Sequence, residues 1–170
     1  FKKIVQCSEY IEENGLTYIT IDHKKAAYEA VSHLISIGKK DIYLFSMKKD
    51  YTYSTLRREG LIEAMKDNGL EFKRENEILL DELSIKEAQK HMNIVLNNRE
   101  VKNIGIFAVS DVIAIGVIKA LNSKNIKIPQ EAAVVGFDNI DFSAVIEPSL
   151  TTVSQPGYEL GVESVKSLMR

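Results

Sequence analysis

The stretch VVGFDNIDFSAVIEPSLTTVSQP, from Val134 to Pro156, decides the fold of this chain. It opens as an apolar run that ends on Gly-Phe-Asp, and a second β-rich run ends on Gln-Pro. Strands of a buried parallel sheet read as continuous apolar segments, and polar turn residues follow them. Asp138 therefore stands at the carboxyl end of a buried strand, either as a turn residue or as a group directed at a ligand.

The rest of the chain alternates predicted strands with predicted helices. Inner strands are continuous apolar runs, and helices begin at capping residues such as Asp22 and Ser84. Strands are predicted over 4–7, 16–21, 41–46, 77–80, 104–109 and 132–137, and helices over 22–38, 55–68, 84–98, 110–124 and 156–169. The pattern predicts an α/β fold, a doubly wound parallel sheet with helices on both faces.

Composition indicates a soluble globular chain of ordinary domain size. Of 170 residues, 45% are hydrophobic and 27% charged, and the formal net charge of -2 gives no overall attraction to a polyanion. Cys7 is the only cysteine, so no internal disulfide forms, and a cytoplasmic location is expected. No apolar run approaches the roughly 18 residues of a membrane span. The chain opens inside a strand-like run, which favours a fragment of a longer protein.

Three polar positions follow different predicted strands. Asp138 ends one strand, Asp111 comes after IFAVS, and Arg57 comes after the loop that follows IYLFS. Ligands of open parallel sheets bind beyond the carboxyl ends of the strands. Two carboxylate acceptors, one guanidinium donor and the nearby Tyr51 and Tyr53 suit a neutral polyhydroxylated ligand better than a phosphate. Each residue alone also has a structural explanation, Asp111 as a helix cap above all.

Signatures of catalysis and metal binding are missing. The chain holds no nucleotide-binding glycine loop and no nucleophile elbow. His23, His33 and His91 lie at spacings that zinc sites do not use. We therefore expect no enzyme activity, no metal and no cofactor.

Several short motifs span nearly the whole chain. They are Arg57-Arg-Glu-Gly60, Phe107-Ala-Val-Ser-Asp111, Ile128-Pro129, Val134-Val-Gly-Phe-Asp138, Leu150-Thr-Thr-Val153 and Gln155-Pro156. In this combination they resemble the effector-binding domain of lactose/galactose-repressor (LacI/GalR) family transcriptional regulators. The resemblance implies the fold of type I periplasmic sugar-binding proteins, in which two α/β lobes hold a ligand between them.

The resemblance also implies a division of the chain and a set of effector contacts. Residues 22–150 would form a complete C-terminal lobe, 1–21 a remnant of the N-terminal lobe, and 151–170 a crossover strand and helix of that lobe. The helix-turn-helix headpiece that reads operator DNA would be absent. Effector contacts are expected from Arg57, Asp111, Asp138, Tyr51, Tyr53, Leu83 and either Cys7 or Ser8.

The expected function is effector sensing for a bacterial transcriptional repressor. The effector would be a small molecule, a sugar by preference, and its binding would control operator binding by the headpiece. A homodimer is expected, with no membrane partner. The competing interpretation is an exported sugar-binding protein of a transport system, which shares the fold and the cleft. The PSLTTVSQP string favours the regulator, and an N-terminal helix-turn-helix or signal peptide would decide.

Overall fold

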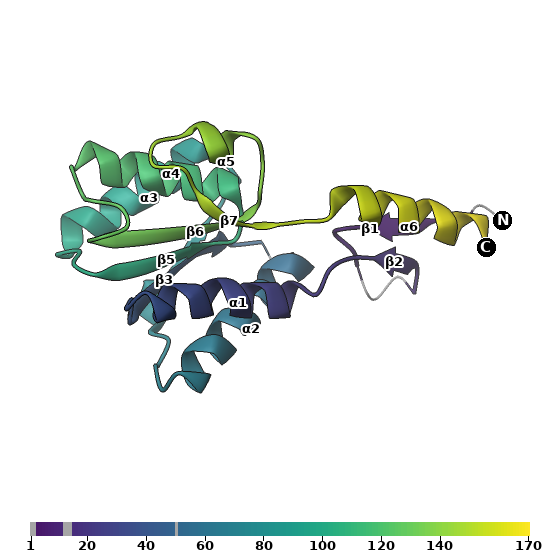
Figure 1. Ribbon diagram of the computed structural model, residues 1–170, viewed down its shortest axis with the longest axis horizontal. Coiled ribbons are helices and arrows are strands. Elements are labelled where there is room, and N and C mark those ends of the chain that lie inside the picture. Colours follow the sequence, from purple (N-terminus) through teal and green to yellow (C-terminus); the bar gives the residue numbers. More distant parts are fainter. Residues whose placement is uncertain (1–2, 12–14, 50) are drawn as a thin grey trace.

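The computed structural model describes residues 3–11, 15–49 and 51–170, which form two lobes of unequal size (Figure 1). The larger lobe is built on a five-stranded parallel sheet of order β4-β3-β5-β6-β7. Its strands are β3 (Asp41–Met47), β4 (Glu77–Leu80), β5 (Ile104–Ala108), β6 (Ala132–Asp138) and β7 (Thr151–Ser154). The smaller lobe holds the parallel pair β1 (Val5–Cys7) and β2 (Thr17–Ile19) with the helix α6 (Gly157–Met169).

Helices cover both faces of the larger sheet. One face carries the packed pair α1 (His23–Ser36) and α2 (Thr52–Asp67), and the other carries α3 (Ile85–Asn98) and α4 (Asp111–Ser123) with the short α5 (Phe142–Val145) (Figure 1). A 3-10 turn, η2 (Arg74–Asn76), precedes β4. The predicted doubly wound α/β architecture is confirmed, because every strand of the sheet is parallel to its neighbours.

Two local features depart from the expected elements. Helix α2 begins at Thr52 rather than Thr55, so Tyr53 lies inside the helix instead of in the preceding loop. This start has no local capping signal, since Tyr51 at the N-cap makes no side-chain capping bond and the Tyr53 ring stacks on it. Helix α5 was not expected, because four residues are too few for a helical period to be visible in the sequence.

The edge strand β7 connects the two lobes. Its residues pair with β6 from Val135↔Thr151 to Asp138↔Ser154. By its hydrogen bonds β7 therefore belongs to the larger sheet, although the boundary expected from the sequence lies just before it at residue 150. After Gln155 the chain runs to α6 in the smaller lobe (Figure 1).

No helix in the part of the chain that the structure describes combines the length and apolar character needed to cross a bilayer.

Close helix packing on the larger sheet depends on glycine. A Cβ added at Gly60 of α2 would lie 2.1 Å from the Lys24 carbonyl oxygen and 2.9 Å from the Tyr28 amide nitrogen, both in α1. These are backbone atoms, which cannot swing aside as a flexible side chain could. The absence of a side chain at residue 60 thus sets the distance between α1 and α2 just where α2 presents Arg57.

We predict that Gly60→Ala destabilises the chain by about 1–3 kcal/mol, because overpacking outweighs the better helix propensity of alanine. Gly161→Ala in α6 is the matched control, since nothing lies within 4 Å of its added Cβ. The control should be neutral or stabilising by up to about 1 kcal/mol. Urea unfolding of both variants measures the difference, and equal effects would contradict the packing explanation.

Candidate functional site

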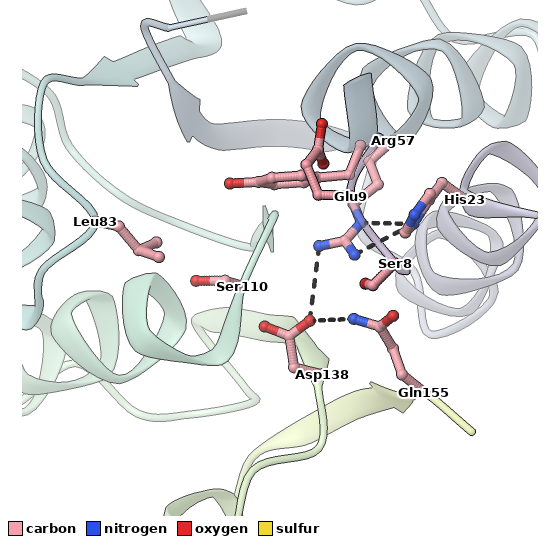
Figure 2. Close-up of a pocket in the computed structure, with 9 residues that line it drawn as sticks. Ser8, Glu9, His23, Arg57, Leu83, Ser110, Asp138 and Gln155 are labelled. Atoms are coloured by element: carbon pink, nitrogen blue, oxygen red, sulfur yellow. Dashed lines mark hydrogen bonds and ion pairs between the residues drawn. The ribbon is translucent and has the colours of Figure 1, made fainter. Parts of the chain in front are cut away.

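A cavity of about 220 Å³ lies at the carboxyl ends of the larger sheet, where the two lobes meet (Figure 2). It is lined by Ser8, Glu9, His23, Tyr53, Arg57, Leu83, Ser110, Asp138 and Gln155. Five residues expected from the sequence are in this set: Ser8, Tyr53, Arg57, Leu83 and Asp138. Two others expected there, Asp111 and Tyr51, are not among the lining residues.

Arg57 is the centre of the cavity wall. Its side chain is only 3% exposed, yet it carries a positive charge in the first turns of α2. The guanidinium donates to the carbonyl oxygen of Val109 and to Nδ1 of His23, at 3.3 Å from Nε and 3.2 Å from the second terminal nitrogen. Its central carbon lies 3.4 Å from the centroid of the Phe137 ring. These contacts hold a buried guanidinium in one orientation while leaving donor capacity for a ligand.

Burial lowers the pKa of Arg57 to about 10, and the Asp138 carboxylate opposes that shift. Arg57 therefore remains a cation at neutral pH. The cavity offers a fixed positive charge whose remaining N–H groups can donate to a ligand oxygen.

Asp138 faces Arg57 across the cavity. The nearest carboxylate oxygen, Oδ1, is 3.8 Å from a terminal nitrogen of Arg57 and accepts a 2.7 Å hydrogen bond from Nε2 of Gln155. Figure 2 shows the second oxygen turned away from Arg57, toward the side where Ser110 lies. Burial raises the pKa of Asp138, and Arg57 opposes the rise. The 3.8 Å gap is too long for a hydrogen bond, so both groups keep capacity for a third partner.

The backbone of Asp138 is as unusual as its position. Its φ is 119°, a conformation that non-glycine residues rarely adopt. The next residue, Asn139, also has a positive φ of 56°. Such backbone angles persist only where the surroundings hold them, and they gather at ligand sites. The bend turns the Asp138 side chain away from the path of β6 and toward the cavity.

Asp111 has a different place from the one expected. Its carboxylate is fully buried and accepts a 2.5 Å bond from the Thr152 hydroxyl and a 2.9 Å bond from the Ile140 amide. Both oxygens are thus engaged inside the larger lobe, where they tie β7 and the loop after β6 to the start of α4. Burial raises the pKa of Asp111, and these hydrogen bonds oppose the rise.

The neighbouring Ser110 reaches the cavity instead. As N-cap of α4 it accepts a 3.4 Å bond from the Ile113 amide while its side chain lines the cavity. In a sequence, a serine at the start of a helix is interpreted as an N-cap. Capping does not prevent the same side chain from facing a ligand.

Gly136 explains how Asp111 fits beside β6. A Cβ at residue 136 would lie 2.3 Å from the Asp111 carboxylate and 2.9 Å from the Leu150 side chain. The three residues of the Gly-Phe-Asp motif therefore have three separate roles. Gly136 leaves room for the Asp111 carboxylate, Phe137 supports the Arg57 guanidinium, and Asp138 faces the cavity.

Tyr53 of α2 and residues from the smaller lobe complete the rim. Tyr53 lines the cavity, and its ring stacks on Tyr51 at a centroid distance of 5.4 Å, so Tyr51 supports the site without lining it. Ser8 adopts a positive φ of 70°, and the neighbouring Glu9 caps α2 by accepting a 3.0 Å bond from the Thr52 amide.

Four lining residues were missed in the sequence: Glu9, His23, Ser110 and Gln155. Gln155 and Ser110 belong to the motifs of the family resemblance, so their signal was present. His23 directly follows the capping Asp22 and looks like an ordinary first residue of a helix. Glu9 carries no local signal, because its position depends on how the smaller lobe meets the larger one.

His23 is buried and lies beside the guanidinium. Burial, reinforced by the Arg57 charge, lowers the pKa of His23 to about 4. The ring is therefore neutral at pH 7 and accepts from Arg57 at Nδ1.

The arrangement offers hydrogen bonds rather than reaction chemistry. Among residues 3–11, 15–49 and 51–170, no three His, Cys, Asp or Glu side chains come together as metal ligands would. The cavity presents one cation, two carboxylates, two serine hydroxyls, an amide and a neutral imidazole beside the Tyr53 ring. Such a set can hold a small polar molecule from several sides.

We predict that His23 contributes an acid-sensitive part of the stability. The unfolded chain takes up the proton near pH 6.5 and the folded chain only near pH 4, so stability falls as pH drops between these values. The loss should be on the order of 2–3 kcal/mol. Urea unfolding at pH 7, 5.5 and 4.5 measures it against His23→Asn, which removes this titration while Asp111 and Asp138 still titrate. Equal pH slopes for the two proteins would refute the assignment.

Comparison with known proteins identifies the family. Residues 14–170 match the family described as periplasmic binding protein-like domain. The HTH-type transcriptional regulator MalR of Clostridium butyricum is 35% identical over 162 residues, which cover 93% of this chain and 48% of MalR. The chain thus spans about half the length of the curated relatives it matches, and those relatives are transcriptional regulators rather than enzymes.

Solved structures agree in fold and in family. An uncharacterized protein from Actinobacillus succinogenes is 36% identical, with a TM-score of 0.87 over 97% of this chain and 61% of that one. The chain is also 29% identical to a LacI family transcriptional regulator from Enterococcus faecium that was solved with bound ribose. The TM-score is 0.78, and the match covers 91% of this chain and 56% of the regulator chain. The chain therefore belongs to the periplasmic binding protein-like domains and is similar to about half the length of LacI-type transcriptional regulators.

Proposed function

We propose that this chain senses a small neutral sugar in the cavity between its lobes and passes that signal to a DNA-binding domain of the whole protein. The observation that carries the proposal is the opposed pair of Arg57 and Asp138, 3.8 Å apart at the lobe boundary. A sugar hydroxyl between them could accept a hydrogen bond from the guanidinium and donate one to the carboxylate. At 3.8 Å the two groups form no hydrogen bond with each other. Such a ligand binds most tightly when both lobes close on it.

Size and charge of the cavity favour a monosaccharide. Its volume of about 220 Å³ is below the roughly 300–1,000 Å³ of sites for drug-sized ligands. The ionised side chains that line it are Glu9, Asp138 and Arg57, so carboxylates outnumber cations and disfavour a phosphate. Tyr53 supplies an apolar ring face with a polar tip. The ribose bound to the Enterococcus faecium relative is in keeping with this chemistry.

In the whole protein the mechanism would be a population shift. A ligand that binds the closed arrangement of the lobes more tightly than the open one favours the closed form. A helix-turn-helix domain elsewhere in the protein would read that change and alter its affinity for operator DNA in the cytoplasm. Whether the sugar releases or strengthens DNA binding depends on which arrangement the DNA-bound form prefers.

The competing function is that of an exported sugar-binding protein for a transporter. It would use the same cavity, so the geometry alone does not favour either. The curated relatives support the regulator, since MalR and CytR are named HTH-type transcriptional regulator and repressor. The sequence encoded ahead of this chain discriminates the two functions, as a helix-turn-helix or as a secretion signal.

Ligand identity can be tested by thermal stability. A ligand at 100 times its Kd stabilises the folded chain by about 2.7 kcal/mol through mass action. On the whole protein, a panel of pentoses, hexoses and purine bases should therefore raise the melting temperature only for the cognate class. A rise with purines and none with sugars would overturn the sugar assignment.

We predict that, in the whole protein, Asp138→Ala weakens binding of the sugar found in that panel by roughly 1–3 kcal/mol, because a buried ligand hydroxyl loses its acceptor. Asp141→Ala is the matched control, since Asp141 lies three residues further on and is exposed. Calorimetric titration should show reduced affinity for the first variant and wild-type affinity for the second. Unchanged affinity in Asp138→Ala would reduce that residue to a turn former.

A homodimer is also part of the proposal. Phe142 and Val145 of α5 are 68% and 75% exposed, which leaves neighbouring apolar side chains on the surface of the larger lobe. Two exposed apolar residues on one short helix offer a candidate surface for contact with a second copy of the chain.

We predict that Phe142→Asp with Val145→Asp shifts the chain from dimer to monomer in sedimentation velocity runs. Ile94→Asp on α3 serves as control, because Ile94 is also an exposed apolar residue, at 48%, but lies on a different helix. A monomeric wild-type chain, or an equal effect of the control, would argue against α5 as the contact.

A further inference from the structure

A chain of hydrogen bonds leads from the cavity arginine into the smaller lobe. Arg57 donates to Nδ1 of His23, and Nε2 on the other side of the His23 ring lies 3.1 Å from the Thr20 hydroxyl. The same hydroxyl donates a 2.7 Å bond to the carbonyl oxygen of Ser8. Thr20 stands between β2 and α1, where the chain passes from the smaller lobe to the larger (Figure 1).

The chemistry of these groups fixes the direction of every bond. An arginine side chain has only donors, so Nδ1 of His23 must be the unprotonated acceptor. A neutral imidazole then carries its proton on Nε2 and donates it to Thr20. Thr20 has one hydroxyl proton, and the Ser8 carbonyl oxygen accepts it. Each member thus donates toward the smaller lobe, and none can reverse without breaking its neighbour's bond.

A second set of contacts ties the same segment to α2. Glu9 Oε1 accepts from the Thr52 amide at 3.0 Å, and the Tyr10 carbonyl oxygen accepts from the Thr52 hydroxyl at 2.8 Å. Thr52 opens the helix that carries Arg57. Residues 8–10 are therefore held at one end by Thr20 and at the other by the start of α2.

We propose that His23 and Thr20 are positioning residues that couple the orientation of Arg57 to the placement of the smaller lobe. This function rests on the proposed sensing role. A ligand oxygen that draws the guanidinium into the cavity would pull on His23 Nδ1 and, through Thr20, on the Ser8 carbonyl. Ser8 is an apt receiver, because it lines the cavity itself and is held in a left-handed conformation that small changes can release.

The alternative is that His23 is merely a packed aromatic. Its ring lies 6.0 Å from Phe137 and 6.4 Å from Tyr53, which would satisfy a packing role without any directed bonds. Packing makes no demand on the tautomer, whereas the relay requires the Nε2–H form. The two explanations therefore differ in a property that can be measured without a ligand.

The first test reads the tautomer in the full 170-residue chain. Nitrogen-15 NMR of the imidazole rings at pH 7 should show His23 with an unprotonated Nδ1 and a protonated Nε2. An Nδ1–H tautomer would overturn the relay, because Arg57 could not donate to it.

The second test measures lobe placement by the distance distribution between two spin labels. The labels are attached through Lys119→Cys on α4 and Glu163→Cys on α6, both exposed positions, in a Cys7→Ser background. We expect one narrow peak in the distance distribution of the labelled chain. Thr20→Val removes the hydroxyl and keeps the shape of the side chain, and it should broaden that peak. Thr17→Val on β2, an exposed threonine outside the relay, should leave the peak narrow.

The coupling itself is tested by combining both ends of the relay. Arg57→Met should broaden the same peak, and Arg57→Met with Thr20→Val should broaden it no further, because both break one chain of bonds. Additive broadening, or a narrow peak in Thr20→Val, would overturn the coupling. Neither result depends on a sugar, so the proposed function stands or falls separately, on the thermal panel.

Discussion

The buried guanidinium of Arg57 is the constraint on which the rest of the site depends. A cation that is only 3% exposed must have partners on every side or the lobe would not fold around it. Those partners come from separate parts of the chain: the end of β5 supplies the Val109 carbonyl, the start of α1 supplies His23, and the end of β6 supplies Phe137 and Asp138. The contacts of the Arg57 guanidinium with these partners thus bring three strand-to-helix connections to one place.

Much of this fold was visible in the sequence because the signals are local. Continuous apolar runs, capping residues and glycines at helix ends predicted the strands β1 to β6 and the five long helices of the described residues, and the strand-end rule brought Arg57 and Asp138 to one cavity. The start of α2 and the short α5 were missed, since the first has no side-chain cap at its N-cap residue and the second is under two turns long.

The errors at the site have a common physical origin. A sequence cannot show which of two adjacent polar residues at a helix start turns inward, and here Gly136 opens the space that Asp111 occupies while Ser110 faces the cavity. Glu9 reaches the site only through the meeting of the two lobes, a long-range contact with no local pattern. The sequence therefore predicted the part of the site that lies in the larger lobe better than the part that the smaller lobe contributes.

The pairing of β7 with β6 has a consequence for how faithfully this edge of the sheet forms. Four residues are a short strand, and an edge strand could slip along its neighbour. In the native alignment Thr152 meets Asp111 inside the lobe, and Gln155 meets Asp138 at the cavity. A slip of one residue would break both bonds at once and leave one oxygen of the buried Asp111 carboxylate without its donor. The two aspartates thus favour the native alignment of β7 over a slipped one, and the cavity gains Gln155 only on the correctly aligned sheet.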